Sequence, residues 1–395
     1  SRFNDDSYDT FSIQSDYVFL GGSIYSDVQM NGTLKLNSDS LQQIPGQYTY
    51  DQTKAKDVGE TKQIFVGVGG TNDEKVLVQL SQKSDDDSGN CYCTIYCIAA
   101  YAYDDLSNLL WHECGQQSLT TGLVIKNKVV YYGTQDETNN IAIARDAWTG
   151  NQKWKKMEPL PTVGEYNGLG LTQPPLADDV NVYFTADASL ILAFDLTTGT
   201  KAWWLGLKSS SDQTATPTFP PIIDSGNLYM CHQSLGEVYV ISATKGSITA
   251  SWAISCQGQP LLWKSNLYFN AQDMGPDYGN GYTWVDLSTM TLNNNGMALG
   301  DGYAFNPAFW NPTISTDGIA VISTTTMYTV HQPSQTKRWT YDSGSNGVIG
   351  LTRVRDGYVY FSVGQAILVL NLYTGEQVAI LPFTGQFINF EFDEA

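Results

Sequence analysis

Short apolar runs separated by turn residues recur along the whole chain. The runs are rich in β-branched and aromatic residues, and most follow a pair of turn formers such as Asp178-Asp179 or Ser225-Gly226. Runs bounded in this way are typical of β-strands joined by tight turns. No sustained periodicity of 3.6 residues is visible between them, so the pattern predicts an all-β chain. The runs lie at residues 17–20, 63–66, 129–132, 181–184, 227–230, 266–269, 318–321 and 358–361.

Each run is followed by a second pattern, which is clearest in ILAFDLTTGTKAWW at residues 191–204. A short strand leads into Asp195, whose carboxylate can accept backbone N–H groups of the following turn. Gly199 can adopt a positive φ without a Cβ clash, and Trp203 lies far enough along the second strand to cover the hairpin. The segment IAIARDAWTGNQKW at residues 141–154 matches it position for position. A unit that recurs in this way indicates a repeat protein.

The position of Asp195 can be followed through the chain, and it recurs roughly every 45 residues. The equivalent residues are Asn37, Asp104, Asp146, Asp195, Ser242, Asp286, His331 and Asn371. The one longer interval contains residues 75–97, which we interpret as an insertion in the second unit. Each unit holds about four strands, which corresponds to a blade of a β-propeller.

We therefore predict an all-β chain that forms an eight-bladed β-propeller of four-stranded antiparallel blades, a single domain over residues 1–395. One four-stranded sheet cannot bury both of its faces, whereas a closed ring of sheets can. Residues 385–395 follow the eighth unit, and we expect them to pair near residues 11–13 and close the ring. The expected blade units are 11–50, 60–115, 120–160, 171–208, 217–256, 257–300, 305–342 and 347–384.

Tryptophans recur near the ends of these units. We expect them to pack between neighbouring blades, which would leave them unavailable for stacking on a cofactor. The predicted blade-packing residues are Trp111, Trp154, Trp203, Trp252 and Trp339.

The chain is strongly acidic, with a net charge of −19. A phosphate backbone or an anionic membrane surface would repel it, which argues against nucleic acid and lipid as partners. No apolar run reaches the roughly 18 residues needed to span a bilayer. The first residues, SRFNDDSYDTF, lack the pattern of a signal peptide, so we expect a mature chain or one made without such a peptide.

The cysteine content indicates an oxidising compartment. The even number and the clustering favour two disulfides among the first four cysteines, with Cys231 and Cys256 as a further candidate pair. A zinc site would prefer C-x-x-C spacings, which are absent. Asn31 begins an Asn-Gly-Thr glycosylation pattern, which agrees with an extracellular, secreted glycoprotein. The six cysteines are Cys91, Cys93, Cys97, Cys114, Cys231 and Cys256.

Two acidic segments offer oxygen ligands of the kind that calcium prefers. One contains Asp85, Asp86 and Asp87 beside the cysteines, and the other contains Asp273 and Asp277 in an inserted turn. Neither has the spacing of a known calcium loop, so solvated surface is the favoured interpretation. No other metal or cofactor is indicated, and no Ser/His/Asp catalytic set is recognisable.

The pattern Ala-x-Asp-x-x-Thr-Gly-x-x-x-Trp resembles the repeat of the pyrroloquinoline-quinone-type propellers. The match is full in the units that end at Trp154 and Trp203 and partial elsewhere. The resemblance implies a propeller fold, and this family contains both quinoprotein alcohol dehydrogenases and a non-catalytic outer-membrane assembly lipoprotein. Family enzymes use an Asp base beside calcium and an Arg near the quinone. This chain lacks their adjacent-cysteine disulfide and has no haem attachment motif, so we expect no catalytic activity.

These observations favour a secreted or cell-surface scaffold that binds a protein partner or copies of itself in an extracellular assembly. Two alternatives stay open. A lectin-like propeller would place aromatic residues in one sugar-binding pocket, with Trp148, Trp204, Trp263 and Trp310 as candidates. A quinone-dependent dehydrogenase would need an acidic cluster with an Arg facing the central channel.

Overall fold

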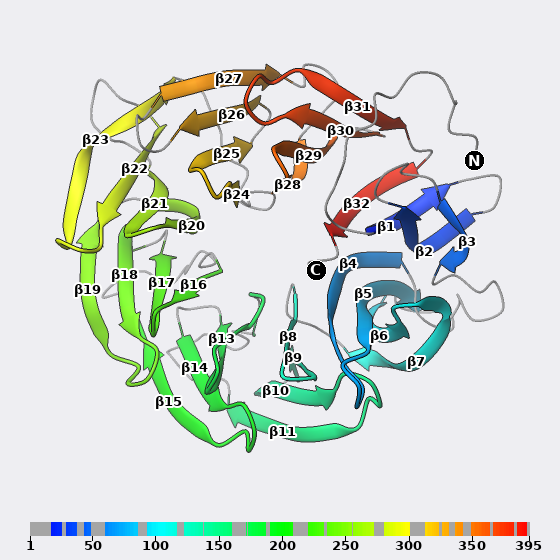
Figure 1. Ribbon diagram of the computed structural model, residues 1–395. Coiled ribbons are helices and arrows are strands. Elements are labelled where there is room, and N and C mark those ends of the chain that lie inside the picture. Colours follow the sequence, from blue (N-terminus) through cyan, green and yellow to red (C-terminus); the bar gives the residue numbers. More distant parts are fainter. Residues whose placement is uncertain are drawn as a thin grey trace.

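In the computed structural model, the described residues form β-strands and their connections (Figure 1). Within some of its strands the backbone alone is described. Among the described residues there is no helix long and apolar enough to cross a membrane. The structure describes residues 17–25, 29–37, 43–48, 60–85, 93–116, 122–136, 138–159, 171, 173–186, 190–207, 220–232, 235–254, 256–271, 280–300, 313–323, 326–331, 336–342, 349–363, 366–382 and 385–392.

The strands form eight four-stranded antiparallel sheets, which we number as blades in chain order. Blade 1 consists of β1 (Tyr17–Tyr25), β2 (Gln29–Asn37), β3 (Gln43–Tyr48) and β32 (Gly385–Phe392), blade 2 of β4 (Glu60–Val68), β5 (Lys75–Asp85), β6 (Cys93–Ala102) and β7 (Asp105–Gln116), blade 3 of β8 (Val124–Lys126), β9 (Val129–Gln135), β10 (Asn139–Asp146) and β11 (Gln152–Pro159), and blade 4 of β12 (Leu176–Ala177), β13 (Asn181–Ala186), β14 (Leu190–Asp195) and β15 (Lys201–Gly206). Blade 5 consists of β16 (Ile222–Asp224), β17 (Asn227–His232), β18 (Glu237–Ser242) and β19 (Ile248–Ala253), blade 6 of β20 (Cys256–Trp263), β21 (Asn266–Ala271), β22 (Asn280–Asp286) and β23 (Thr291–Gly300), blade 7 of β24 (Thr313–Ile314), β25 (Ile319–Ser323), β26 (Thr326–His331) and β27 (Thr336–Asp342), and blade 8 of β28 (Ile349–Arg355), β29 (Tyr358–Val363), β30 (Ala366–Asn371) and β31 (Gln377–Pro382).

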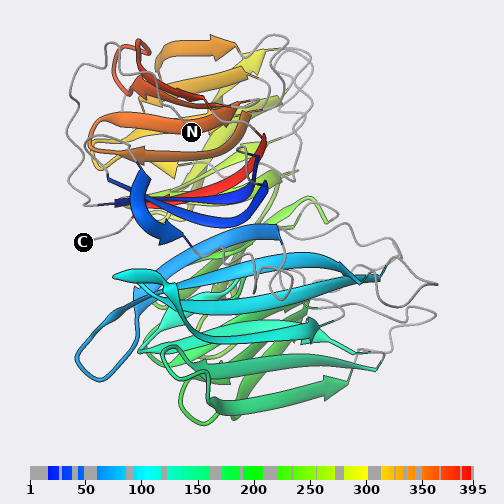
Figure 2. The ribbon, with the colours of Figure 1, turned by 90° about the vertical axis from the view of Figure 1, so that its right-hand side faces the viewer.

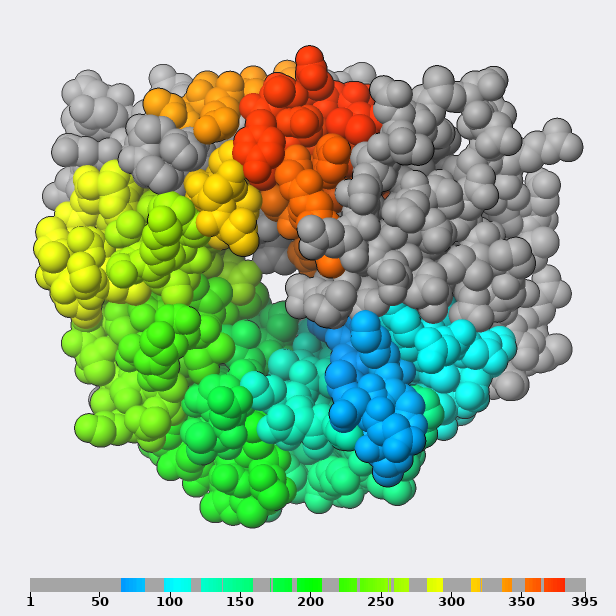
Figure 3. All heavy atoms as spheres, in the orientation of Figure 1, coloured from blue at the N-terminus to red at the C-terminus, as the bar shows by residue number. Residues whose placement is uncertain are grey.

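The sheets surround a central opening (Figures 1 and 3). Their innermost strands contact one another in the order β4, β8, β12, β16, β20, β24, β28 and β32, and β32 contacts β4 again. The ring is therefore closed, and no blade leaves an open sheet face at a gap in the circle.

The ring closes through the pairing of N- and C-terminal strands, as predicted for residues 385–395. The innermost strand of blade 1 is β32. The partner of β32 is β1, with Val18 opposite Phe392 and Ile24 opposite Gly385. Residues 11–13, the expected partner, lie outside the described residues. The alternation of apolar and polar residues indicated a closing strand. It does not say with which of the neighbouring apolar runs this strand pairs, because the pairing register depends on tertiary context.

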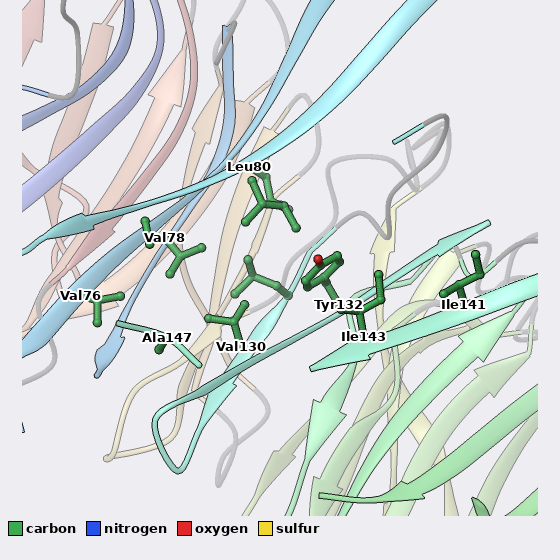
Figure 4. Packing of buried hydrophobic residues seen from close by; sticks show 11 residues of the cluster. Val76, Val78, Leu80, Val130, Tyr132, Ile141, Ile143 and Ala147 are labelled. Atoms are coloured by element: carbon green, nitrogen blue, oxygen red, sulfur yellow. The ribbon is translucent and has the colours of Figure 1, made fainter. Parts of the chain in front are cut away.

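The blades meet face to face, and we call each contact between neighbours a seam. At seam 2/3 the buried side chains of Val76 and Val78 in β5 face Val130 in β9 and Ile143 in β10 (Figure 4). The second and third strands of a blade are buried on both faces, which explains their nearly continuous apolar runs. The outermost strands β15 and β19 instead alternate exposed and half-buried residues, because only one face of each contacts the next blade.

In blades 2 to 8, two of the three turns lie at the same end of the sheet, because successive strands run antiparallel. These are the turn from the first to the second strand and the turn from the third to the fourth strand. We call this end of the ring the turn face, and Figure 2 shows the ring from the side. The described turns on this face are residues 69–74, 127–128, 178–180, 225–226, 264–265, 315–318, 356–357, 103–104, 147–151, 196–200, 243–247, 287–290 and 372–376.

Candidate functional site

The turn between the third and fourth strands is organised by one acidic side chain and one glycine. In blade 4, Oδ1 of Asp195 accepts the backbone N–H groups of Thr197 and Thr198 at 3.1 and 2.7 Å. The N–H of Gly199 donates to the carbonyl of Asp195 at 2.9 Å. Hydrogen bonds to the carboxylate, first among them that from the Thr198 N–H, lower the pKa of Asp195 below its usual value. The side chains of Asp146 and Asn371 accept the same turn N–H groups in blades 3 and 8.

Replacement of Asp195 by alanine should lower the free energy of unfolding by about 1–2 kcal/mol, because two turn N–H groups lose their acceptor. Asp195→Asn should stay within about 0.5 kcal/mol of the unmodified protein, since Asn371 makes the same contacts in blade 8. Urea denaturation followed by far-UV circular dichroism measures both changes. An asparagine variant as unstable as the alanine variant would show that the charge, rather than the acceptor geometry, stabilises the turn.

A tryptophan from the preceding blade covers several of these turns. Trp154 in β11 donates its Nε1–H to the carbonyl of Leu196 at 2.9 Å across seam 3/4. A Cβ added to Gly199, whose φ is +64°, would lie 2.6 Å from the Trp154 ring, so glycine is needed beneath it. We call this arrangement of indole, carbonyl and glycine the tryptophan lock. The same lock joins Trp111 to Ala147 and Gly150, Trp203 to Ala243 and Gly246, and Trp339 to Leu372 and Gly375.

In blade 2 the residue equivalent to Asp195 is Ala102, so the assignment of Asp104 to this position is wrong. The N–H of Tyr103 donates to the carbonyl of Lys75, which is the bond that the residue after Asp195 makes in blade 4. The third and fourth strands of blade 2 are joined by a tighter turn, with Ala102 pairing directly with the first residue of β7. Asp104 therefore lies in an exposed turn without the role predicted for it.

Trp252 packs against the buried cluster at seam 5/6, but it does not occupy the lock position. It pairs with Val238, whereas the lock position in β19 is held by Ala250, which pairs with Val240. Within the described part of the chain, the Trp252 indole makes no hydrogen bond. The sequence pattern therefore placed Trp252 at the lock position, whereas that position lies two residues earlier.

Two disulfides are present among the described residues. Cys97 and Cys114 join the paired strands β6 and β7 within blade 2. Cys231 in β17 is bonded to Cys256 in β20, which connects blade 5 to blade 6. Cys91 and the side chain of Cys93 lie outside the described residues, so a second disulfide among the first four cysteines stays a prediction.

The predicted calcium segments and the glycosylation residue are described only in part. Asp85 ends β5, with its side chain outside the described residues, and Asn31 lies in β2 opposite Ser23. The remaining candidates, Asp86, Asp87, Asp273 and Asp277, lie outside the described residues altogether. Where side chains are described, no three His, Cys, Asp or Glu residues gather in a group that could hold a metal ion.

Five of the eight exposed large apolar side chains of the described residues lie on the turn face, each in a different blade. Val180 is 57 % exposed between β12 and β13, and Tyr373 is 45 % exposed between β30 and β31. Val68, Met290 and Ile248 are also exposed at or beside turns of this face. The three other exposed large apolar residues in the described chain, Met157, Trp204 and Ile380, lie on the outermost strands.

Carboxylates also lie on the turn face. Ion pairs join the turns of successive blades, with Lys128 at 2.7 Å from Asp73 and Lys126 at 2.7 Å from Asp179. Hydrogen bonds within the turns lower the pKa values of several of the carboxyls, so they remain ionised at neutral pH. The acidic residues on this face include Asp73, Asp179, Asp195, Asp224, Asp286, Asp317 and Asp356. The face therefore combines apolar contact area with fixed negative charge.

The three described tryptophans among those considered for sugar binding do not line one pocket. Trp148 packs at seam 2/3, and Trp263 donates its Nε1–H to the carbonyl of Thr316 at seam 6/7. Trp204 is 62 % exposed, but it lies alone on the outermost strand of blade 4. Trp310 lies outside the described residues.

An ionic network at seam 2/3 was not anticipated from the sequence. The Arg145 guanidinium lies 2.7 Å from Glu113 and donates its Nε–H to the Tyr132 hydroxyl at 2.9 Å. The Tyr132 hydroxyl donates in turn to Glu113 at 2.7 Å, and burial raises its pKa. In the sequence, this site is indicated by Arg145, a charged residue within the otherwise apolar strand IAIARD. Because Arg145 is engaged between two blades, its geometry fits a structural role.

His232 is a further buried titratable group. Its Nδ1 accepts the backbone N–H of Leu235 at 3.2 Å, and burial lowers its pKa. The ring is thus held neutral by its surroundings and has no described nucleophile beside it.

Part of the sequence matches a known family, and the fold is shared with several solved structures. Residues 99–260 match the profile of the family described as outer membrane protein assembly factor BamB. No curated protein matches the chain in sequence. Among solved structures, BamB from Moraxella catarrhalis superposes with a TM-score of 0.55 at 14 % identity, over 83 % of this chain and 85 % of that protein.

Enzymes share the same architecture. The dihydro-heme d1 dehydrogenase NirN has a TM-score of 0.61 at 12 % identity, over 96 % of this chain and 76 % of NirN. Quinohemoprotein alcohol dehydrogenase ADHIIG from Pseudomonas putida HK5 has a TM-score of 0.56 at 12 % identity, over 83 % of this chain and 66 % of the enzyme. At these identities the likeness shows the fold alone. The repeat over residues 99–260 and the overall fold are thus similar to those of PQQ-like propellers.

Proposed function

We propose that this propeller is a non-catalytic scaffold that binds a protein partner through its turn face. The observation that carries the proposal is that most of the exposed large apolar side chains of the described residues, Val180 and Tyr373 among them, lie on this face together with ionised carboxylates. Exposed apolar residues among polar groups are a feature of protein interaction sites. Turns on a rigid scaffold are also where binding residues concentrate.

Two further observations support this role. The family profile that matches residues 99–260 is that of an assembly factor, and a BamB structure shares the fold. The disulfides favour an oxidising compartment, so we propose that the protein acts outside the cell or on its surface. The partner is either a different protein or further copies of this chain in an extracellular assembly.

Site-specific photo-crosslinking in the native source tests the proposal. A photoreactive amino acid is introduced at Val180 or Tyr373 on the turn face and, as a matched control, at Trp204 on the outer wall. We expect discrete crosslinked species from the two turn-face positions and none from Trp204, and mass spectrometry distinguishes a second copy from another protein. Absence of crosslinks from the turn face, or equal crosslinking from Trp204, would contradict the proposed binding surface.

A further inference from the structure

Seam 5/6 lacks the tryptophan lock that the structure shows at seams 2/3, 3/4, 4/5 and 7/8. All three residues of the lock differ there together. An alanine replaces the tryptophan, a valine replaces the small residue paired with it, and a methionine with a φ of +55° replaces the turn glycine. The set at seam 5/6 is Val240, Ala250 and Met290, whereas the set at seam 4/5 is Ala193, Trp203 and Gly246.

The joint replacement has a steric reason. At the lock seams, a Cβ on the turn glycine would lie 2.8 Å or closer to the tryptophan ring, so a side chain there and a lock tryptophan exclude each other. With alanine at position 250, the turn of blade 6 tolerates Met290. The consequence is that blades 5 and 6 lose an interblade hydrogen bond and a buried indole at the turn face.

The same seam carries the disulfide between Cys231 and Cys256. Cys231 lies near the end of β17 and Cys256 begins β20, so the bond lies toward the end of the sheets opposite the turn face. Both residues are buried and belong to the apolar cluster that contains Leu267 and Phe269 of blade 6. Of the two described disulfides, this is the one that joins two blades.

We propose that Cys231–Cys256 keeps the ring closed at seam 5/6 in place of the missing lock, which makes this seam a redox-sensitive joint. A dithiol reductant would transfer two electrons and two protons, so that the S–S bond breaks, two thiols form and the reductant becomes a cyclic disulfide. The reduced ring would then open at seam 5/6 before any locked seam.

The rate of reduction reports directly on the opening of this seam, because the buried sulfur atoms are reached only when the blades separate. Installing the lock with Val240→Ala, Ala250→Trp and Met290→Gly should therefore slow reduction of Cys231–Cys256 by dithiothreitol at least about tenfold, which corresponds to about 1.4 kcal/mol. Thiol alkylation and peptide mapping measure this rate. Reduction of Cys97–Cys114 within blade 2 is the internal control and should keep its rate.

Hydrogen exchange of the intact protein tests the joint without relying on reductant access. In the Cys231→Ala/Cys256→Ala variant, the amides of β17 and β20 should exchange at least about tenfold faster. The amides of β11 and β14 at the locked seam 3/4 should keep their rates. Adding the three lock substitutions should restore slow exchange at seam 5/6. A Cys97→Ala/Cys114→Ala variant serves as the disulfide control and should leave seam 5/6 unchanged.

Every outcome decides the proposal. Unchanged exchange at β17 and β20, equal loosening of all seams, or a lock that fails to slow reduction would overturn it. If the Cys231→Ala/Cys256→Ala variant does not fold, the test is whether the same variant folds when it also carries the three lock substitutions. Recovery of the folded ring supports the proposal, and continued failure to fold overturns it.

Discussion

Replacement of Trp154 by alanine is expected to lower the free energy of unfolding by about 3–5 kcal/mol, the range for removing a large aromatic side chain from a packed interior. Trp154 is only 6 % exposed; it packs against Tyr131 of its own blade and against Phe194 across seam 3/4. Its indole N–H is also a donor to the Leu196 carbonyl, which would keep only the hydrogen bond from the Tyr131 hydroxyl at 3.2 Å. Both losses fall on the same seam, so the variant should unfold at much lower urea concentration.

Trp204 provides the matched control in the same protein. It is the same residue type on the outermost strand of the next blade, but it is 62 % exposed. Trp204→Ala should change the free energy of unfolding by no more than about 0.5 kcal/mol. Far-UV circular dichroism is the suitable probe, since both variants alter the tryptophan fluorescence. If both variants lose the same free energy of unfolding, the contact of Trp154 with the next blade does not stabilise the protein.

The repeat was readable from the sequence because a single unit combines three residues with separate physical tasks. Asp195 caps the turn, Gly199 supplies its positive φ, and Trp203 reaches the following blade. Each residue type is restricted by its task, so the spacing stands out against a variable background. The repeat, the all-β class and the pairing of the chain's two ends could all be predicted in this way.

The errors of alignment have a common physical origin. Trp252 and Asp104 were each assigned two residues away from the true equivalent position. A displacement of two residues returns a side chain to the same face of a strand, so the alternation of apolar and polar residues is unchanged by it. Only the backbone pairing, which depends on turn length and bulges, distinguishes the two positions.

The functional surface was less accessible from the sequence. Val180 and Tyr373 lie in different blades, and nothing local relates them until the ring brings their turns to one face. The contact of Arg145 with Glu113 likewise joins two blades. Sequence patterns specify the strand and the turn, whereas a site assembled from several blades depends on the closed ring.

Replacement of Gly246 by alanine is the second change with a large expected effect. Gly246 has a φ of +63°, and an added Cβ would lie 2.4 Å from two atoms of the Trp203 ring. The backbone conformation costs roughly 1–2 kcal/mol for a residue with a Cβ. Displacement of Trp203 adds roughly 1–3 kcal/mol, the cost typical of overpacking, so the free energy of unfolding should fall by a total of about 2–5 kcal/mol.

Gly226→Ala separates the two contributions, because Gly226 has a φ of +76° and nothing within 4 Å of the added Cβ. This variant should lose only the conformational part, about 1–2 kcal/mol. A double-mutant cycle completes the argument. In a Trp203→Ala background, Gly246→Ala should cost no more than Gly226→Ala does, because the ring that it strikes is gone. If the cost of Gly246→Ala is the same with and without Trp203, the glycine is required by the turn alone, and the tryptophan lock is not the reason for its presence.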